Sequence, residues 1–172
     1  MSKDKSVSLA TTRHVHDHCL CFAAQRAARA LARRFDEVLR PVGLTSGQFS
    51  LLMSLNQPAP PSVGSVASLL GMDRTTLRAN LKPLERQGLV QTTVDPSDGR
   101  GRLLVLTQAG HRRLMSALPI WQRTHADAER LVPSDAETVR AGLWALSREG
   151  GLQMSRSGYC SGASPEELSR RG

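Results

Sequence analysis

The sequence is poor in aromatic residues and in cysteines, and it lacks long apolar runs. Three Phe, two Trp and one Tyr make up 3% of the 172 residues, so we expect a mostly aliphatic, helical core. Three cysteines (Cys19, Cys21 and Cys160) are too few and too unevenly spaced for a disulfide framework. No stretch approaches the ~20 consecutive apolar residues that cross a bilayer, and residues 1–12 lack the apolar segment of a secretion signal. We therefore expect a cytoplasmic protein with reduced thiols and no membrane partner.

Signatures of common enzyme classes are also missing. The chain contains no Gly-x-Ser-x-Gly turn, no Walker phosphate loop and no His-Glu-x-x-His helix. The nearest glycine-rich feature, Gly99-Arg100-Gly101, falls between two predicted strands rather than between a strand and a helix. We expect neither enzymatic activity nor a bound cofactor or metal.

Positive charge is what the sequence has in excess. Twenty-three Lys and Arg residues against fifteen Asp and Glu give a formal charge of +8 and a pI near 10.6. This balance favours a polyanionic partner, which basicity alone leaves open between nucleic acid and an anionic membrane surface.

Hydrophobic periodicity predicts a helical domain between two flexible extensions. The first long helix should run from about His16 to Arg40 and end at Pro41, with a separate stripe of arginines. Its apolar stripe consists of Leu20, Ala24, Ala27, Ala28, Leu31, Phe35 and Val38. The predicted parts are a flexible N-terminal arm (1–13), a domain (14–148) and a flexible C-terminal tail (149–172).

Three shorter helices should follow, each opened by a capping residue. Thr45 precedes a helix to about Asn56, and Ser62 precedes a short helix that ends at Gly71. Asp73 precedes the third, from Arg74 to Gln87, and two helices joined at a glycine form a helix-turn-helix. The residues expected to be buried are Phe49, Leu52, Met53, Leu55, Val63, Val66, Leu69, Leu70, Leu77, Leu81 and Leu84.

A β-hairpin and two more helices complete the prediction. The strands Leu89–Val94 and Arg102–Leu106 are joined by a loop rich in Pro, Asp and Gly. Thr107 then caps a helix, and Ser134 with Glu137 forms the capping box of the last one. Their apolar faces comprise Leu114, Leu118, Trp121, Val139, Leu143, Trp144 and Leu146.

The expected fold is therefore mainly α with a small β-hairpin wing. A winged helix-turn-helix over about 44–106 is flanked by helices over about 14–40 and 107–148. These helices carry more apolar surface than one winged helix covers, which predicts a homodimer.

A winged helix with basic residues on its second helix and its hairpin suits double-stranded DNA, since the major groove admits a helix. Arg78 is expected to pair with a guanine, whereas Lys82 and Arg86 should meet backbone phosphates. Arg100 and Arg102 in the hairpin can enter a narrow minor groove, with Asp95 and Asp98 bracing the loop. The predicted DNA-binding residues are Arg74, Thr75, Thr76, Arg78, Lys82, Arg86, Arg100 and Arg102.

Two segments resemble the MarR family of bacterial transcriptional regulators. Asp73-Arg74-Thr75-Thr76 through Leu81-Lys82-Pro83-Leu84-Glu85 and Gly88-Leu89-Val90 is similar to the family's recognition helix. Asp95-Pro96-Ser97-Asp98-Gly99-Arg100 followed by Leu106-Thr107-Gln108-Ala109-Gly110 is similar to its wing. The resemblance covers about residues 15–148. It implies a homodimeric regulator, most often a repressor, that binds a pseudo-palindromic operator and responds to a small-molecule effector in a crevice between its lobes.

A narrower resemblance concerns Cys21. Leu20-Cys21-Phe22 is similar to the reactive-cysteine segment of the hydroperoxide-sensing branch of that family, which implies an alternative function as a thiol-based sensor. That branch places tyrosines around its thiol, and the corresponding positions here are Gln25, Phe35 and Ser46. With those hydroxyls missing, we expect a structural Cys21, because the thiolate is the reactive form.

Two further alternatives stay open. Metal regulation would need His14 and His18, which share a helix face, together with His16, Cys19, His111 or His125. An interaction module that uses the arginine stripe of the first helix would bind lipid or protein without any DNA sequence preference. The effector-binding residues are unknown, although Arg26 or Arg29 could pair with an aromatic anion.

Overall fold

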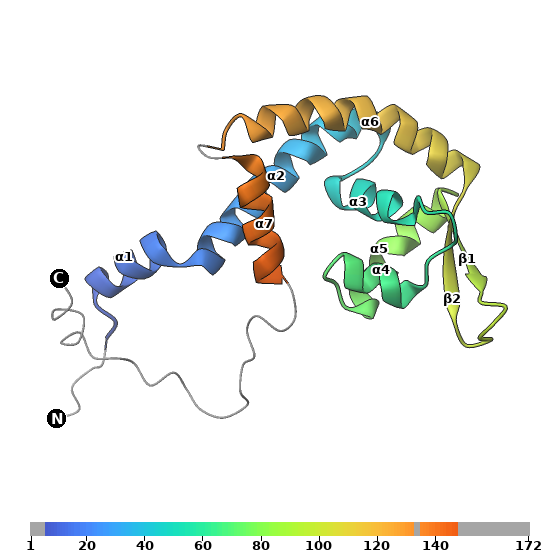
Figure 1. The fold of residues 1–172 in the computed structure, drawn as a ribbon, viewed down its shortest axis with the longest axis horizontal. Coiled ribbons are helices and arrows are strands. Elements are labelled where there is room, and N and C mark those ends of the chain that lie inside the picture. The colour runs from blue at the N-terminus through green and yellow to red at the C-terminus, as the bar shows by residue number, and fades with distance from the viewer. Residues whose placement is uncertain (1–5, 133–134, 148–172) are drawn as a thin grey trace. The chain divides into compact units, whose positions relative to one another are not determined.

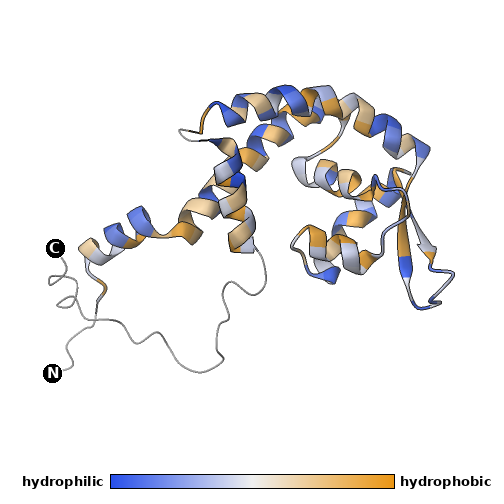
Figure 2. Ribbon diagram, viewed as in Figure 1, coloured by the Kyte–Doolittle hydropathy of each residue, from blue (hydrophilic) through white to orange (hydrophobic). Residues whose placement is uncertain are grey.

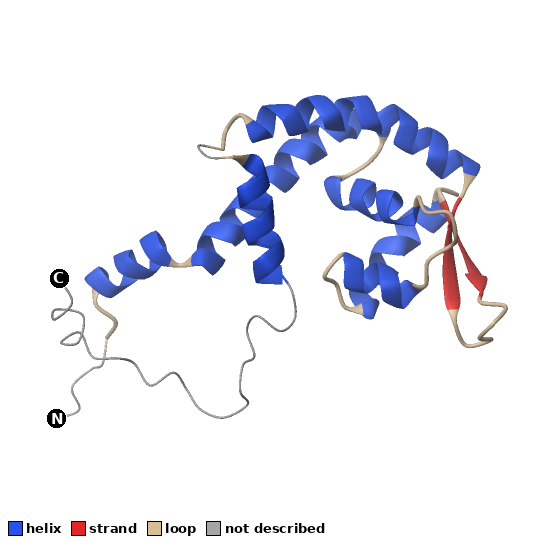
Figure 3. Ribbon diagram, in the orientation of Figure 1, coloured by secondary structure: helices blue, strands red, loops and turns tan. Residues whose placement is uncertain are grey.

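The computed structural model describes residues 6–132 and 135–147. They form helices and a single antiparallel hairpin, as Figure 3 shows, which confirms the predicted mainly helical fold with a β-hairpin. The elements are α1 (Leu9–His18), α2 (Leu20–Leu39), the 3-10 helix η1 (Arg40–Val42), α3 (Ser46–Leu55), α4 (Val63–Leu69), α5 (Arg74–Arg86), β1 (Val90–Val94), β2 (Arg102–Leu106), α6 (Gln108–Glu129) and α7 (Ala136–Ser147).

The chain divides into two compact units, residues 1–133 and 134–172. The first contains α1 to α6 and the hairpin, and α7 belongs to the second. Figure 1 shows how the hairpin follows α5 and leads directly into the long α6.

Helices α3, α4 and α5 enclose an aliphatic core with the hairpin. Its fully buried side chains are Leu39, Leu51, Leu52, Leu77, Leu84, Leu104 and Val66. The predicted caps are confirmed: the hydroxyls of Thr45 and Ser62 and the carboxylate of Asp73 accept backbone N–H groups at the starts of α3, α4 and α5. Gly71 and Gly88 follow α4 and α5 with φ of +62° and +67°, a conformation that favours glycine.

Two predicted core residues are exposed instead. Leu69 is 52% exposed because α4 buries Val63, Val66 and Ala67 and half-buries Leu70, a spacing that leaves Leu69 outside. Met53 is 40% exposed, because α3 packs on α2, α4, α6 and β2 and only the Met53 face is left free.

The hairpin is anchored beside α4 through the middle of β2. β1 pairs with β2 in the register Val90↔Leu106 to Val94↔Arg102, so the first strand begins one residue later than predicted. Outside the ladder, the Leu104 amide donates to the Pro61 carbonyl oxygen at 2.9 Å. This bond holds β2 against the segment that precedes α4.

The predicted first helix is two helices. α1 begins at Leu9, inside the predicted arm, and the chain is extended at Cys19 (φ −78°, ψ 109°) before α2 begins. The Cys19 Sγ atom accepts the Phe22 N–H at 3.4 Å and so caps α2. Periodicity could not reveal this break, because a cysteine is not among the residues that usually cap helices.

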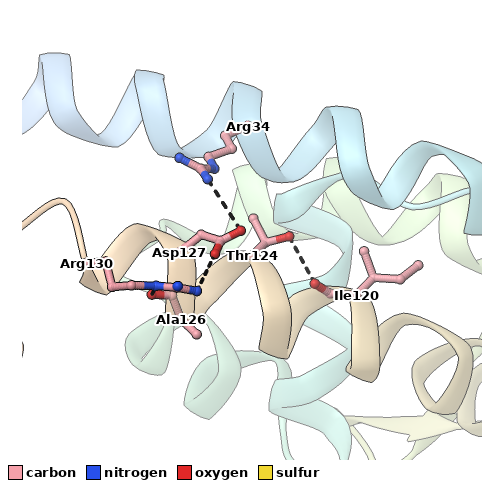
Figure 4. A network of polar contacts seen from close by, with 6 residues as sticks. All are labelled: Arg34, Ile120, Thr124, Ala126, Asp127 and Arg130. Atoms are coloured by element: carbon pink, nitrogen blue, oxygen red, sulfur yellow. Dashed lines mark hydrogen bonds and ion pairs between the residues drawn. The ribbon is translucent and has the colours of Figure 1, made fainter.

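α2 and α6 pack against each other and carry a polar network (Figure 4). The Asp127 carboxylate lies 3.8 Å from Arg34 Nη2 on α2 and 2.6 Å from Arg130 Nη2. Thr124 is buried, and its hydroxyl donates to the Ile120 carbonyl oxygen at 3.0 Å. Figure 2 shows hydrophobic and hydrophilic residues alternating along both helices. The side chains of Leu20, Phe22, Leu31, Met115 and Leu118 on these helices stay exposed.

α7 differs from the prediction in its cap and in its burial. Asp135 accepts the Thr138 amide at 2.9 Å, whereas the predicted capping residue Ser134 lies outside the described residues. Val139, Leu143, Trp144 and Leu146, predicted to be buried, are exposed. Residues 1–5 of the predicted arm and the predicted tail also lie outside the described part.

Candidate nucleic-acid interface

The start of α5 is fixed by Asp73. Its carboxylate accepts the Thr76 amide at 2.8 Å and the Thr76 hydroxyl at 2.6 Å. These hydrogen bonds hold the pKa of Asp73 below its ordinary value, and the bond from the Thr76 hydroxyl has the larger effect. The ionised Asp73 carboxylate therefore stabilises the folded state above the ordinary carboxylate pKa, and this contribution is lost as the pH falls through the lowered pKa.

α5 has a basic, exposed face beside a buried, apolar one. Leu77, Leu81 and Leu84 point into the core. The exposed face carries a positive side chain at every fourth residue, so that the charges follow one another along the helix. We call Arg74, Arg78, Lys82 and Arg86 the basic stripe, and all four are exposed. A helix that lies in a groove of a polyanion with this face toward it would place a row of positive charges against the negative groups.

Two predicted contact residues at the start of α5 also have partners within the protein. The Thr76 hydroxyl donates to Asp73, so it serves the helix cap. Arg74 reaches back over α4, where a Cβ atom built on Gly64 would lie 3.2 Å from its Nη2 atom. The other two predicted contact residues in the first two turns of α5, Thr75 and Arg78, are exposed.

The hairpin loop 95–101, which we call the wing tip, is held by its own aspartates, as predicted. Asp95 Oδ1 accepts the Ser97 hydroxyl and amide at 2.7 and 2.8 Å, which lowers the pKa of this carboxyl group. Asp98 Oδ1 accepts the Arg100 amide at 3.0 Å. The wing tip thus has a defined shape before any partner binds.

The two wing arginines are held differently. Arg102 Nη1 donates to the carbonyl oxygens of Gly99 and Gly101 at 3.3 and 2.9 Å. The Arg100 side chain is exposed and makes no hydrogen bond or ion pair within residues 6–132 and 135–147. Of the two, Arg100 is the one whose guanidinium these contacts leave free.

Two contacts that the sequence did not indicate join α5 to the hairpin. The Thr92 hydroxyl on β1 donates to Glu85 Oε1 at 2.5 Å. The Thr107 hydroxyl donates to the Gly88 carbonyl oxygen at 2.7 Å. These bonds fix the helix that carries the basic stripe relative to the wing. The sequence could not predict these two hydrogen bonds, because both depend on how the hairpin packs against the end of α5.

The Cys21 thiol is exposed and has a polar neighbour. Cys21 is exposed in the first turn of α2, and its Sγ atom accepts a hydrogen bond from the side-chain Nε2 of Gln25 at 3.2 Å. Arg29 Nη2 donates to Gln25 Oε1 at 3.0 Å. Gln25, one of the three positions expected around this thiol, is therefore a neighbour of Cys21 in the structure. Of the three positions named for it, the structure shows a contact only with Gln25 among the described residues.

Several histidines considered as metal ligands contact one another or a carboxylate. His14 and His18 stack with their ring centroids 4.3 Å apart, so they share a face as predicted. His16 pairs with Asp17, and His125 Nε2 lies 3.2 Å from Glu129 Oε1. Within the described part of the chain, no three or more His, Cys, Asp or Glu side chains group as metal ligands would. The same residues contain no helix long and apolar enough to span a membrane.

The chain is similar to known regulators. A MarR family model matches residues 42–101, which include the helix-turn-helix and most of the wing. The HTH-type transcriptional regulator YwoH of Bacillus subtilis is 32% identical over 100 residues, 58% of this chain and 72% of that protein.

Solved structures extend the similarity beyond the winged helix. The M. tuberculosis transcriptional regulator MosR, in complex with DNA, is 35% identical with a TM-score of 0.70, over 76% of this chain and 94% of that one. The repressor CouR bound to a 23-mer DNA duplex is 29% identical with a TM-score of 0.63, over 82% and 95% of the two chains. CouR from Rhodococcus jostii has also been solved bound to p-coumaroyl-CoA.

Proposed function

This chain belongs to the MarR family of DNA-binding transcriptional regulators, and we propose that it is a homodimeric repressor whose pseudo-palindromic operator is released when a small-molecule effector binds. It acts on DNA in the cytoplasm and catalyses no reaction. The observation that carries the proposal is the basic stripe on α5, exposed beside a wing whose tip presents Arg100.

The basic stripe and the wing contact different parts of the DNA. Arg78 reads a base edge in the major groove, because a guanidinium matches guanine O6 and N7. Lys82 and Arg86, farther along α5, contact phosphates, which fix the register without reading sequence. Arg100 enters the adjacent minor groove. Arg74, Thr75 and Thr76 line the end of the helix nearest to the DNA.

Dimerisation uses the helices on either side of the winged helix, residues about 14–40 and 107–148. Each carries apolar side chains that the single chain leaves in water, such as Leu31 on α2, Leu118 on α6 and Leu143 on α7. Exposed apolar side chains that gather into a patch mark an interface in soluble proteins. A two-fold dimer also matches two half-sites one helical turn apart.

The dimer is tested by substituting one exposed leucine on α2 and one on α4 of the winged helix. Sedimentation at micromolar concentration should give twice the 18.7 kDa of the chain. Leu31→Glu should dissociate this dimer, since burying a carboxylate without a partner costs several kcal/mol, about as much as a dimer contact contributes. Leu69→Glu, at a similarly exposed leucine of α4, is the control and should stay dimeric. A wild-type monomer would contradict the proposal.

The effector that we propose is an aromatic anion. CouR binds p-coumaroyl-CoA, a phenolic thioester with phosphate groups, and α2 of this chain carries exposed cationic side chains. Arg26 and Arg29 are the arginines that we propose as its partners.

A second candidate function is thiol-based sensing of an organic hydroperoxide by Cys21. Its support is the exposed sulfur in the first turn of α2, which accepts the Gln25 N–H, while Arg29 in turn donates to Gln25. A hydrogen-bond donor and a helix N-terminus both favour the thiolate. The thiolate would attack the peroxide, giving a sulfenic acid and releasing an alcohol.

Operator binding after treatment with cumene hydroperoxide decides between the two. Under the sensing function, oxidant lowers the affinity of the wild type for DNA, and Cys21→Ser abolishes this response. The matched control, in which Cys19 and Cys160 are both changed to Ser, should respond like the wild type. Unchanged DNA binding in all three proteins would contradict peroxide sensing and leave the aromatic anion as the effector.

A further inference from the structure

The backbone of the wing tip is held on both sides of Arg100. On the N-terminal side, the Arg100 amide donates to Asp98 Oδ1 at 3.0 Å. The loop is closed by the Asp95 amide, which donates to the Gly101 carbonyl oxygen at 3.1 Å, and by the Gly101 amide, which donates to the Asp98 carbonyl oxygen at 2.7 Å. A Cβ atom on Gly101 would lie only 2.9 Å from Asp95 Cβ, so the two arms of the loop approach closely.

Arg102 completes this arrangement from the first position of β2. Its Nη1 atom donates to the carbonyl oxygens of Gly99 and Gly101, the two residues that flank Arg100. Two carbonyl dipoles that converge on one point repel each other, and a guanidinium between them relieves the repulsion and forms charge-assisted hydrogen bonds. The side chain of Arg102 thus fixes the backbone from which Arg100 projects.

We propose that Arg102 is a positioning residue of the wing, which sets the direction of Arg100 without contacting DNA itself. The proposal rests on the minor-groove role of Arg100 in the proposed function. It replaces the expectation that both arginines enter the groove, because the Arg102 guanidinium is already bound to the loop. The value of this arrangement is pre-organisation: a side chain that is aimed before binding loses less conformational freedom on binding.

Two wing variants and their combination test the proposal on operators with either A·T-rich or G·C-rich flanks. Wild type should prefer A·T-rich flanks, since a narrow minor groove concentrates negative potential on an inserted guanidinium. Arg100→Ala and Arg102→Ala should each lower affinity for A·T-rich flanks by about tenfold, and each should remove most of the preference. Because Arg102 acts through Arg100, the double variant should bind within about twofold of Arg100→Ala alone.

The control pair is Arg86→Ala in the wild-type and Arg100→Ala backgrounds. Arg86 lies on α5 and Arg100 on the wing, so the two substitutions should act independently. The fold-losses of affinity from Arg86→Ala and Arg100→Ala should therefore multiply. Thermal unfolding midpoints of all variants should match the wild type, since Arg100 and Arg102 are both exposed.

Other outcomes overturn the inference. If Arg102→Ala weakens binding equally on both flanks and its loss multiplies with that of Arg100→Ala, Arg102 contacts a phosphate. Full wild-type affinity in Arg102→Ala, or a wild type without flank preference, would also contradict the positioning role. Failure of the wild type to bind any DNA would instead contradict the proposed function, and so the two failures are distinguishable.

Discussion

Replacing Arg78 with alanine is expected to cost ~1–3 kcal/mol of operator binding and to relax the preference at one base-pair position in each half-site. Arg78 lies in the second turn of α5 and is exposed, whereas the neighbouring Leu77 and Leu81 are buried. Its guanidinium can form two parallel hydrogen bonds to guanine, which no other base offers in that geometry.

Lys82→Ala is the matched control on the same stripe, one helical turn farther along. A phosphate contact carries no sequence information, so the loss should be uniform across operators. The slope of log affinity against log salt should fall by about one unit, because one fewer counterion is released. Competition binding across single-base operator variants at several salt concentrations measures both effects. Identical, uniform losses for Arg78→Ala and Lys82→Ala would show that Arg78 reads no base.

Gly110→Ala is expected to destabilise the fold by ~1–3 kcal/mol, the usual cost of forcing an extra methyl group into a packed site. Gly110 is buried in the first turn of α6, where the chain leaves the hairpin. A Cβ atom there would overlap the Leu89 carbonyl oxygen and lie 2.6 Å from Leu106 Cδ1. The Leu89 carbonyl cannot easily move, since it also accepts the Thr107 amide at 3.1 Å.

Gly47→Ala is the control for this substitution. Gly47 lies in the first turn of α3, and a Cβ atom there would meet nothing within 4 Å. Alanine also has the higher helix propensity, so this variant should be as stable as the wild type or slightly more so. Chemical denaturation of the three proteins measures the difference. Equal unfolding free energies for Gly110→Ala and Gly47→Ala would show that the close approach has no energetic consequence.

The elements that sequence could predict are those fixed by local chemistry. Thr45, Ser62, Asp73 and Thr107 each accept a backbone N–H at the start of the helix predicted for them. The residue that forms the capping hydrogen bond is the same residue whose type predicts a helix start, so the sequence alone is enough to locate it. The exposed basic stripe follows in the same way from the four-residue spacing.

What sequence could not predict depends on packing from several sides or on side-chain direction. Met53 is apolar and periodic, yet it lies on the one face of α3 that no neighbour covers. The break at Cys19 rests on a sulfur that accepts a backbone N–H, which is an unusual cap. Arg102 looked equivalent to Arg100, because its bonds to the loop carbonyls exist only once the loop has folded.

The most direct test of the central claim is footprinting of the purified protein on DNA fragments that it selects from the genome of its source organism. The account predicts a protected pseudo-palindrome with two half-sites about one helical turn apart, each contacted in the major groove and in a flanking minor groove. It also predicts that specific binding exceeds binding to unrelated DNA by at least about a thousandfold. Binding of equal strength to all fragments, without a protected site, would contradict it.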